Sequence, residues 1–259
     1  MVLSGERQRQ RNSLVPRTFT RLLAIAGVAV LLLQGGCSLA PPIDAPRPSA
    51  VREPLPLKVG VYYSPDFRGR EEVFTKQYIE TYTFRLGEPS VELFDRVFGF
   101  TFAETAAVDS LPPFETAVPD LDAVIEPYFA EVTPFYGSTN PSGFGYVLLK
   151  MTLGYGFRLY SPEGEQIADW RVEGFASSAA GPGEGKSYTT DIPMVDAFLS
   201  PIIIGNFISD MTSDERNPVS ARFAFVTEMA MAVAAQKFHT GAGTVPAIER
   251  LVDAHGSGG

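Results

Sequence analysis

The most regular pattern in the chain is an alternation of apolar and polar positions over residues 147–159. Each of the seven odd positions there is apolar, while the even positions include Lys150 and Arg158. Successive side chains of a strand point to opposite faces of its sheet, so the pattern predicts a long strand with one buried face. Ser161-Pro162-Glu163-Gly164 has the proline and glycine of a type I turn, and a second alternation around Trp170 follows it. We therefore expect an antiparallel hairpin with Trp170 packed in the core.

Shorter patterns predict the other elements of one domain, which we place at residues 57–240. Alternating β-branched and aromatic residues favour strands, and apolar positions three or four apart favour helices. Together they predict an α+β fold with a mainly antiparallel sheet of about five to six strands and with helices packed on one face. The expected strands cover residues 57–64, about 73–86 and 121–132, and the expected helices cover about 90–102 and 217–237.

Three segments lack a pattern of this kind. Residues 177–190 are rich in glycine and serine, which predicts a mobile loop. The apolar stretch Met194–Met211 is interrupted by Pro201 and Gly205, so it forms at most two short helices. Residues 241–259 begin and end with glycines and are expected to form a flexible C-terminal tail.

The first 36 residues have the organisation of a secretory signal. Five arginines lie between positions 7 and 21, and the uncharged apolar run Leu22–Leu33 follows them. A basic start, a short apolar core and small residues before the cut define such a signal. The twelve-residue core is shorter than the roughly 20 residues that a membrane-spanning helix needs. A single-pass anchor or a buried helix is the alternative.

Cys37 directly follows this signal and is the only cysteine of the chain. Leu33-Gln34-Gly35-Gly36-Cys37 resembles the bacterial lipobox, although its leucine stands four places before the cysteine rather than three. The resemblance implies that Cys37 becomes the lipidated first residue of a mature lipoprotein. Ser38 at the next place implies sorting to the outer membrane, on its periplasmic side.

Residues 37–56 hold six prolines and no apolar periodicity. Such a segment favours an extended chain, which predicts a tether with a reach of at most roughly 60 Å. The signal holds five of the 21 basic residues and one of the 30 acidic ones, so the mature chain carries a net charge of −13. This charge excludes nucleic acid as a partner and makes an anionic lipid surface unattractive, which leaves the covalent lipid as the membrane anchor.

The chain offers little for catalysis. Its two histidines, His239 and His255, lie beside glycines near the C-terminus, and no Cys or His residues have metal-ligand spacing. Residues 181–187 do not have the spacing of a phosphate-binding loop. Glu126 and Glu131 stand five residues apart on one strand, which predicts opposite faces for them. We therefore expect no enzymatic activity, no cofactor and no metal.

A docking surface is the remaining candidate site. The broken apolar stretch cannot bury itself as one amphipathic helix, so part of it is a candidate patch for a partner. The alternative is that it packs over a sheet edge, in which case the polar face of the hairpin, around Arg158, Asp169 and Arg171, becomes the candidate. The candidate partner-binding residues of the apolar stretch are Phe198, Leu199, Ile202, Ile203, Ile204 and Phe207.

The order of elements, with a turn at 161–164 followed by Trp170, resembles the small domain of TolB amino-terminal regions, CsgG and LpoB over about residues 57–237. This resemblance implies a non-enzymatic domain that docks onto envelope machinery. Two functions stay open. The first is an adaptor or assembly factor for a cell-envelope protein complex, of unknown oligomeric state. The second is a lipoprotein that binds a small or lipidic ligand in a pocket between sheet and helices.

Overall fold

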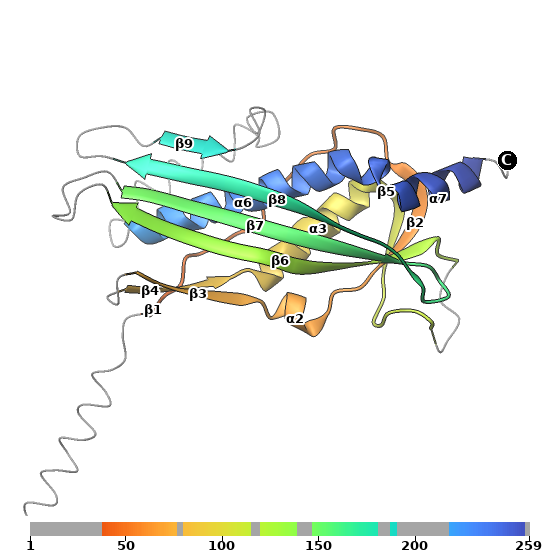
Figure 1. Ribbon diagram of the computed structural model, residues 1–259, viewed down its shortest axis with the longest axis horizontal. Helices are drawn as coiled ribbons and strands as arrows, with labels where there is room; N and C mark the ends of the chain where they lie inside the picture. The colour runs from red at the N-terminus through yellow and green to blue at the C-terminus, as the bar shows by residue number, and fades with distance from the viewer. Residues whose placement is uncertain are drawn as a thin grey trace, which may run out of the picture. The chain divides into compact units, whose positions relative to one another are not determined.

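The computed structural model describes residues 38–76, 80–114, 120–138, 147–180, 187–190 and 218–256. Leu39–Gly259 form one unit with its own core, and the other unit, Met1–Ser38, lies outside the described residues except for its last residue. Within the described ranges, six strands form one sheet in the order β5-β2-β6-β7-β8-β9 (Figure 1). These strands are β2(Leu55–Val61), β5(Phe102–Ala107), β6(Ala123–Ser138), β7(Val147–Tyr160), β8(Gln166–Ala180) and β9(Ser187–Thr190).

The fold is α+β as expected, but the sheet is mixed rather than mainly antiparallel. β2 pairs parallel with both β5 and β6, whereas β6, β7, β8 and β9 pair antiparallel in succession. The reason is the long connection between β2 and β5, which includes α3(Gly87–Thr101). A crossover of this length brings the chain back in the same direction. Alternation of side chains identifies the buried face of a strand but carries no information about its direction.

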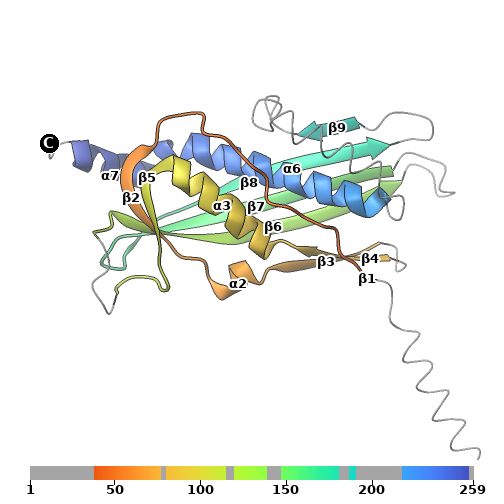
Figure 2. The same cartoon turned by 180° about the vertical axis from the view of Figure 1, so that it is seen from behind.

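The helices α3 and α6(Pro218–Gly241) pack on the same face of the sheet, as predicted (Figures 1 and 2). Phe94 of α3 contacts Phe157 of β7 with ring centroids 5.3 Å apart. Phe238 of α6 contacts the same ring at 4.5 Å and Trp170 at 6.0 Å. Aromatic rings therefore fill the space between sheet and helices, and Trp170, expected in the core, is half-buried and packs against it.

The alternation predicted for β7 is confirmed. From Leu149 to Leu159, no odd-numbered side chain is more than 1% exposed. The predicted turn after β7 also forms, because Gly164 N donates to Ser161 O at 3.0 Å. Gly164 has a φ of 96°, a conformation in which a side chain would be strained.

The segment expected as one strand over residues 73–86 is instead a hairpin of β3(Glu71–Lys76) and β4(Glu80–Arg85). Even positions of β3 pair with even positions of β4, as in Phe74 with Tyr82. The apolar alternation therefore has the same phase in both strands, and the sequence pattern does not indicate the turn between them. The hairpin belongs to a smaller sheet of order β1-β4-β3, in which β1 is Ser38–Leu39. Phe74, Tyr82 and Phe84 surround Phe223 of α6.

Two expected loops contain regular structure. Residues 177–180 continue β8, and β9 pairs with the end of that strand. Of the expected loop at 177–190, only residues 181–186 lie outside the described residues. Where the sequence suggested a flexible tail, a 3₁₀ turn at Ala242–Thr244 leads into α7(Pro246–Gly256), and Ile248 of α7 is buried. Gly241 and Gly243 end α6 without ending the fold, because Pro246 begins a second helix at its first position.

Candidate functional site

Cys37 and the candidate partner-binding residues of the apolar stretch lie outside the described residues. Nothing in the structure therefore tests Cys37 as a lipidation site or residues 194–211 as a docking surface. Leu39, two residues after Cys37, is described and packs against the core. None of the described helices is both long and apolar enough to cross a bilayer. In the same part of the chain, no three His, Cys, Asp or Glu side chains are grouped so that they could hold a metal ion.

The proline-rich segment is not a free tether. Residues 39–54, which we call the proline strap, run over the helices α3 and α6 before entering β2 (Figure 2). Pro41 and Pro46 are buried, and Leu39, Ile43 and Ala45 pack against the core. The predicted reach of the tether is therefore wrong. A segment without periodicity can still bury side chains when neighbouring helices provide the surface.

Helix side chains hold the backbone of the strap. The guanidinium of Arg96, in α3, donates to the carbonyls of Ala45 at 3.4 Å and Pro46 at 3.1 Å. Asp44 N donates to Glu228 Oε1, in α6, at 2.9 Å. Prolines have no N–H and cannot form a ladder, so these contacts with α3 and α6 take the place of strand pairing.

His239 of α6 makes a further contact with the strap and is completely buried. Val51 N donates to His239 Nε2 at 3.2 Å, so Nε2 carries no proton. Thr101 Oγ1 donates to Val97 O at 2.6 Å and lies 2.9 Å from His239 Nδ1, which must therefore be the protonated nitrogen. Burial, together with the charge of Arg52 on the strap, lowers the pKa of His239 to about 4. This histidine is neutral and structural.

Acid is expected to weaken this contact. The unfolded histidine has a pKa of 6.5 and the folded one a pKa of about 4, so the folded state binds fewer protons between these values. The stabilisation that neutral His239 contributes to the folded state is complete above pH 6.5 and is lost as the pH falls toward 4. We expect the free energy of unfolding of the wild type, relative to His239→Gln, to fall by about 3 kcal/mol from pH 7 to pH 4.

Denaturant unfolding of both proteins across this pH range measures the difference. Burial raises the pKa of Glu228 to about 7, so Glu228 alone would stabilise the fold as the pH falls from 7. Glu228 is present in both proteins, and its effect cancels in the difference. A difference that stays constant with pH would contradict the neutral, strap-binding role of His239.

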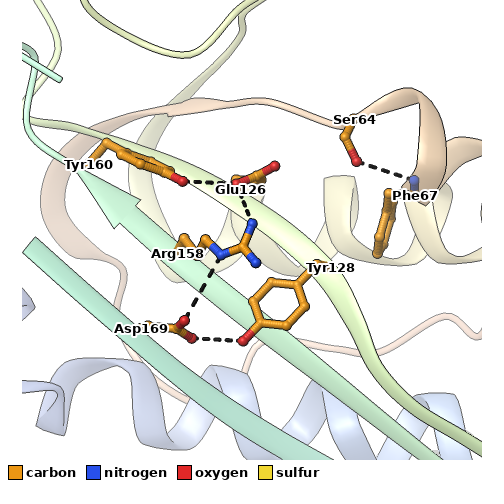
Figure 3. Close-up of polar contacts among 7 residues, drawn as sticks. All are labelled: Ser64, Phe67, Glu126, Tyr128, Arg158, Tyr160 and Asp169. Carbon is orange, nitrogen blue, oxygen red and sulfur yellow. Dashed lines mark hydrogen bonds and ion pairs between the residues drawn. The ribbon is translucent and has the colours of Figure 1, made fainter. Parts of the chain in front are cut away.

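A polar network covers the opposite face of the sheet, which we call the outer face (Figure 3). Glu126, Arg158 and Asp169 are directly paired across β6, β7 and β8, so they form one row. Arg158 Nη1 lies 3.2 Å from Glu126 Oε2, and Arg158 Nε lies 3.9 Å from Asp169 Oδ2. Glu126 is only 7% exposed, so the guanidinium compensates a carboxylate that would be costly to bury alone.

Two tyrosines complete this outer-face network. Tyr160 OH donates to Glu126 Oε2 at 3.0 Å, and Tyr128 OH donates to Asp169 Oδ1 at 2.8 Å. The Arg158 guanidinium lies 4.4 Å from the centre of the Tyr128 ring, which is cation–π geometry. The ring lies across Gly156, where a Cβ would come within 2.0 Å of Tyr128 Cζ. The glycine of β7 is what allows the tyrosine to lie flat.

The electrostatics of the network follow from these contacts. Burial lowers the pKa of Arg158, but the hydrogen bond and charge of Glu126 outweigh it and raise the pKa overall. Burial and Glu126 both raise the pKa of Tyr160. The Arg158 guanidinium thus stays charged at neutral pH, and the Tyr160 phenol stays protonated. A row of tyrosine, arginine and carboxylate side chains held by these contacts has the chemistry of a recognition surface.

The sequence indicated part of this network. Arg158 and Asp169 were expected on the polar face of the hairpin, and they lie there. Glu126 was missed, and the prediction that Glu126 and Glu131 lie on opposite faces is wrong. The pairing of β6 with β7 shifts between Phe129 and Glu131, and this bulge brings both carboxylates to the outer face. The sequence carries no clear signal for the bulge.

A cavity and a groove are lined by described residues. A cavity of about 130 Å³ is lined by Tyr63, Arg68 and Asp95 together with apolar side chains, and Tyr63 OH donates to Asp95 Oδ1 at 2.8 Å. A groove of about 420 Å³ lies between the proline strap and α3. Its lining includes the four carboxylates Asp44, Glu88, Glu92 and Asp95.

No protein-family model matches this chain, and no curated protein matches it. Among solved structures, a DUF330 protein from Xanthomonas campestris is similar at 10% identity, covering 82% of this chain and 97% of that chain with a TM-score of 0.39. A minor lipoprotein from Acinetobacter baumannii is similar at 11% identity, covering 74% of this chain and 93% of that chain with a TM-score of 0.28. At such identities and TM-scores, the function has to be argued from the residues of the chain itself.

Proposed function

We propose that this protein is a periplasmic lipoprotein, anchored in the outer membrane through lipid on Cys37. We further propose that it acts as a non-enzymatic adaptor or assembly factor in a cell-envelope protein complex. The signal-like residues 1–36 and the cysteine directly after them support the anchor. The outer-face network supports the adaptor, and it is the observation that carries the proposal.

The composition of the network is that of a protein-binding surface. Tyrosine and arginine are the residues, with tryptophan, that most often dominate binding energy at interfaces. Here each of them is fixed before a partner arrives, by hydrogen bonds to Glu126 and Asp169 and by the ring stacked under Arg158. Side chains that are already ordered lose less conformational entropy when a partner binds. A rigid surface of this kind favours specific docking.

The outer face is also close in size to a protein interface. β6, β7 and β8 hold 16, 14 and 15 residues. At about 3.4 Å per residue and about 4.8 Å between strands, the three strands present roughly 700 Å². A stable protein interface buries about 800 Å² on each partner. Within the described ranges, α3, α6 and the strap cover the helical side of the sheet, which leaves the outer face as the side available to a partner.

The described residues favour an adaptor over a carrier of a small or lipidic ligand. The space between β7 and the helices is filled by aromatic rings, and the cavity of about 130 Å³ is smaller than the roughly 300 Å³ of ligand pockets. The groove beside the strap is large enough, but its lining of carboxylates suits neither an acyl chain nor an anionic headgroup.

A photoreactive amino acid at Arg171, exposed on the outer face, tests the proposal in intact cells. We expect a discrete cross-linked protein from this position and none from Glu249, exposed on α7. Glu173→Arg should lower the cross-linking yield at Arg171 about tenfold, because it reverses a charge in the proposed interface. Glu249→Arg is the matched control and should leave the yield unchanged.

Circular dichroism distinguishes lost docking from lost folding, since Glu173 is exposed and its replacement should leave the spectrum unchanged. Equal cross-linking from Arg171 and Glu249, or a yield that Glu173→Arg leaves intact, would contradict docking through the outer face.

A further inference from the structure

The position of Leu39 limits where the lipid can leave the domain. Consecutive Cα atoms are about 3.8 Å apart, so Cys37 lies within about 8 Å of Leu39. Leu39 packs against the core and belongs to β1, which pairs with β4. An acyl chain on Cys37 would therefore emerge beside the β3–β4 hairpin, since the strap leaves no long linker between lipid and domain.

This hairpin lies at one identifiable end of the sheet. Lys76 Nζ, at the end of β3, lies 3.9 Å from the centre of the Tyr136 ring, near the end of β6. Figures 1 and 2 show β1, β3 and β4 at the end where β6 finishes and β7 begins, and α7 at the opposite end. We call the first of these the anchor end.

An aromatic side chain is exposed at the anchor end. Phe135 is 45% exposed, and the other large hydrophobic side chains exposed in the described ranges are Val51 and Val73. A Cβ on Gly137 would lie 2.8 Å from Phe135 Cε1, so the ring leans along β6 toward the end of the strand. Lys150, directly paired with Phe135, has its Nζ 5.4 Å from the centre of the ring.

We propose that the anchor end lies on the bilayer that holds the Cys37 lipid, with Phe135 in the interfacial region and Lys150 beside lipid phosphates. This inference rests on the proposed lipid anchor. Aromatic rings and lysines together are typical of membrane interfaces, where a ring enters the headgroup layer and a lysine extends its ammonium to the phosphates. The occupant is a phospholipid surface, because a lipid fixed so close to the domain brings that surface against it.

Charge supports the same orientation. The mature chain is strongly acidic, so an anionic lipid surface repels most of it and selects an end where cations face the lipid. Glu80, the acid of the hairpin beside this end, is paired with Lys76 at 3.4 Å. Glu131, on the outer face of β6, lies four residues before Phe135, or about 14 Å along the strand, which exceeds the screening length in physiological salt.

The orientation places the outer-face network away from the membrane. Arg158 lies eight residues beyond Lys150 on the same strand, which is about 27 Å at the rise of a strand. A partner docked on Arg158 and Tyr128 would thus contact the adaptor in the periplasm rather than at the lipid surface.

Tryptophan fluorescence tests the contact directly. Trp170 is the only tryptophan, so Phe135→Trp in a Trp170→Phe chain carries one probe at the anchor end. The full lipidated protein is reconstituted in vesicles of phosphatidylethanolamine and phosphatidylglycerol, with and without brominated acyl chains. We expect brominated lipid to reduce the fluorescence of this probe about twofold. Glu163→Trp, exposed in the turn after β7, is the matched probe and should keep its fluorescence.

Protein mass separates the two claims. If Cys37 carries no lipid, the anchor is wrong and this inference falls with it. If Cys37 is lipidated and the Phe135→Trp probe is quenched no more than the Glu163→Trp probe, the anchor stands and the orientation is wrong. Cys37→Ser should remove both lipid and quenching. Should Trp170→Phe unfold the domain, the same probes are read in chains that keep Trp170, as the difference from wild type.

Discussion

Leu153→Asp is expected to unfold the domain, whereas Thr152→Asp, one residue earlier on β7, should leave it folded. Leu153 is 0% exposed and faces the layer between sheet and helices, while Thr152 is half-buried on the outer face. An aspartate at 153 would have to bury an unpaired carboxylate, at a cost of several kcal/mol. Domains of this kind are stable by about 5–15 kcal/mol, so the substitution removes much of the margin.

Thermal melts followed by circular dichroism measure both variants. We expect Leu153→Asp to lose its cooperative transition, or to melt far below the wild type, and Thr152→Asp to melt within a few degrees of it. Similar melting temperatures for the two variants would mean that the buried face of β7 has been assigned to the wrong side.

The sequence predicted β7 because a one-sided buried strand leaves a strict period of two. The same argument predicted α3, whose apolar residues recur at helical spacing, and the turn at 161–164, whose Gly164 adopts a positive φ. The buried face or backbone conformation of each of these elements depends on residues within the element itself. The local sequence therefore predicts each of them without knowledge of the rest of the chain.

The strap could not be predicted in this way. Its contacts join Asp44 to Glu228 and Val51 to His239, pairs separated by 184 and 188 residues. Proline density predicts an extended backbone, and beyond Leu39 the strap lacks regular secondary structure as expected. What composition cannot indicate is whether distant helices supply the donors and the apolar surface that hold an extended segment in place.

The outer-face network is an intermediate case. The alternation of β8 places Asp169 and Arg171 on a polar face, so the sequence gives the face correctly. It does not give the partners of that face, because Glu126 and Tyr128 reach it through the pairing of β6 with β7. A bulge in β6 then changes which of its residues point outward, and only the paired strands fix its position.

Gly174→Ala is expected to destabilise the fold by about 3 kcal/mol, because α6 lies directly on β8 at this position. A Cβ there would come within 1.9 Å of Ala230 O and 2.8 Å of Ala234 N. Both are backbone atoms of a buried helix, so no side-chain rotation relieves the clash, and α6 has to move away from the sheet by about 1 Å or more. Gly99→Ala is the matched control, since nothing lies within 4 Å of its Cβ on the exposed side of α3.

The control, Gly99→Ala, should change the free energy of unfolding in the opposite direction, because alanine stabilises the α3 helix by about 0.5–1 kcal/mol relative to glycine. Denaturant unfolding measures both effects. Because α6 also carries Glu228 and His239, displacing it should loosen the strap, and trypsin should then cut after Arg52 faster in Gly174→Ala than in the wild type. If trypsin cuts Gly174→Ala faster while its free energy of unfolding is unchanged, the strap opens independently of the cooperative unfolding of the core. Unchanged stability in Gly174→Ala would mean that α6 does not rest on β8 so closely, and that the strap depends on some other support.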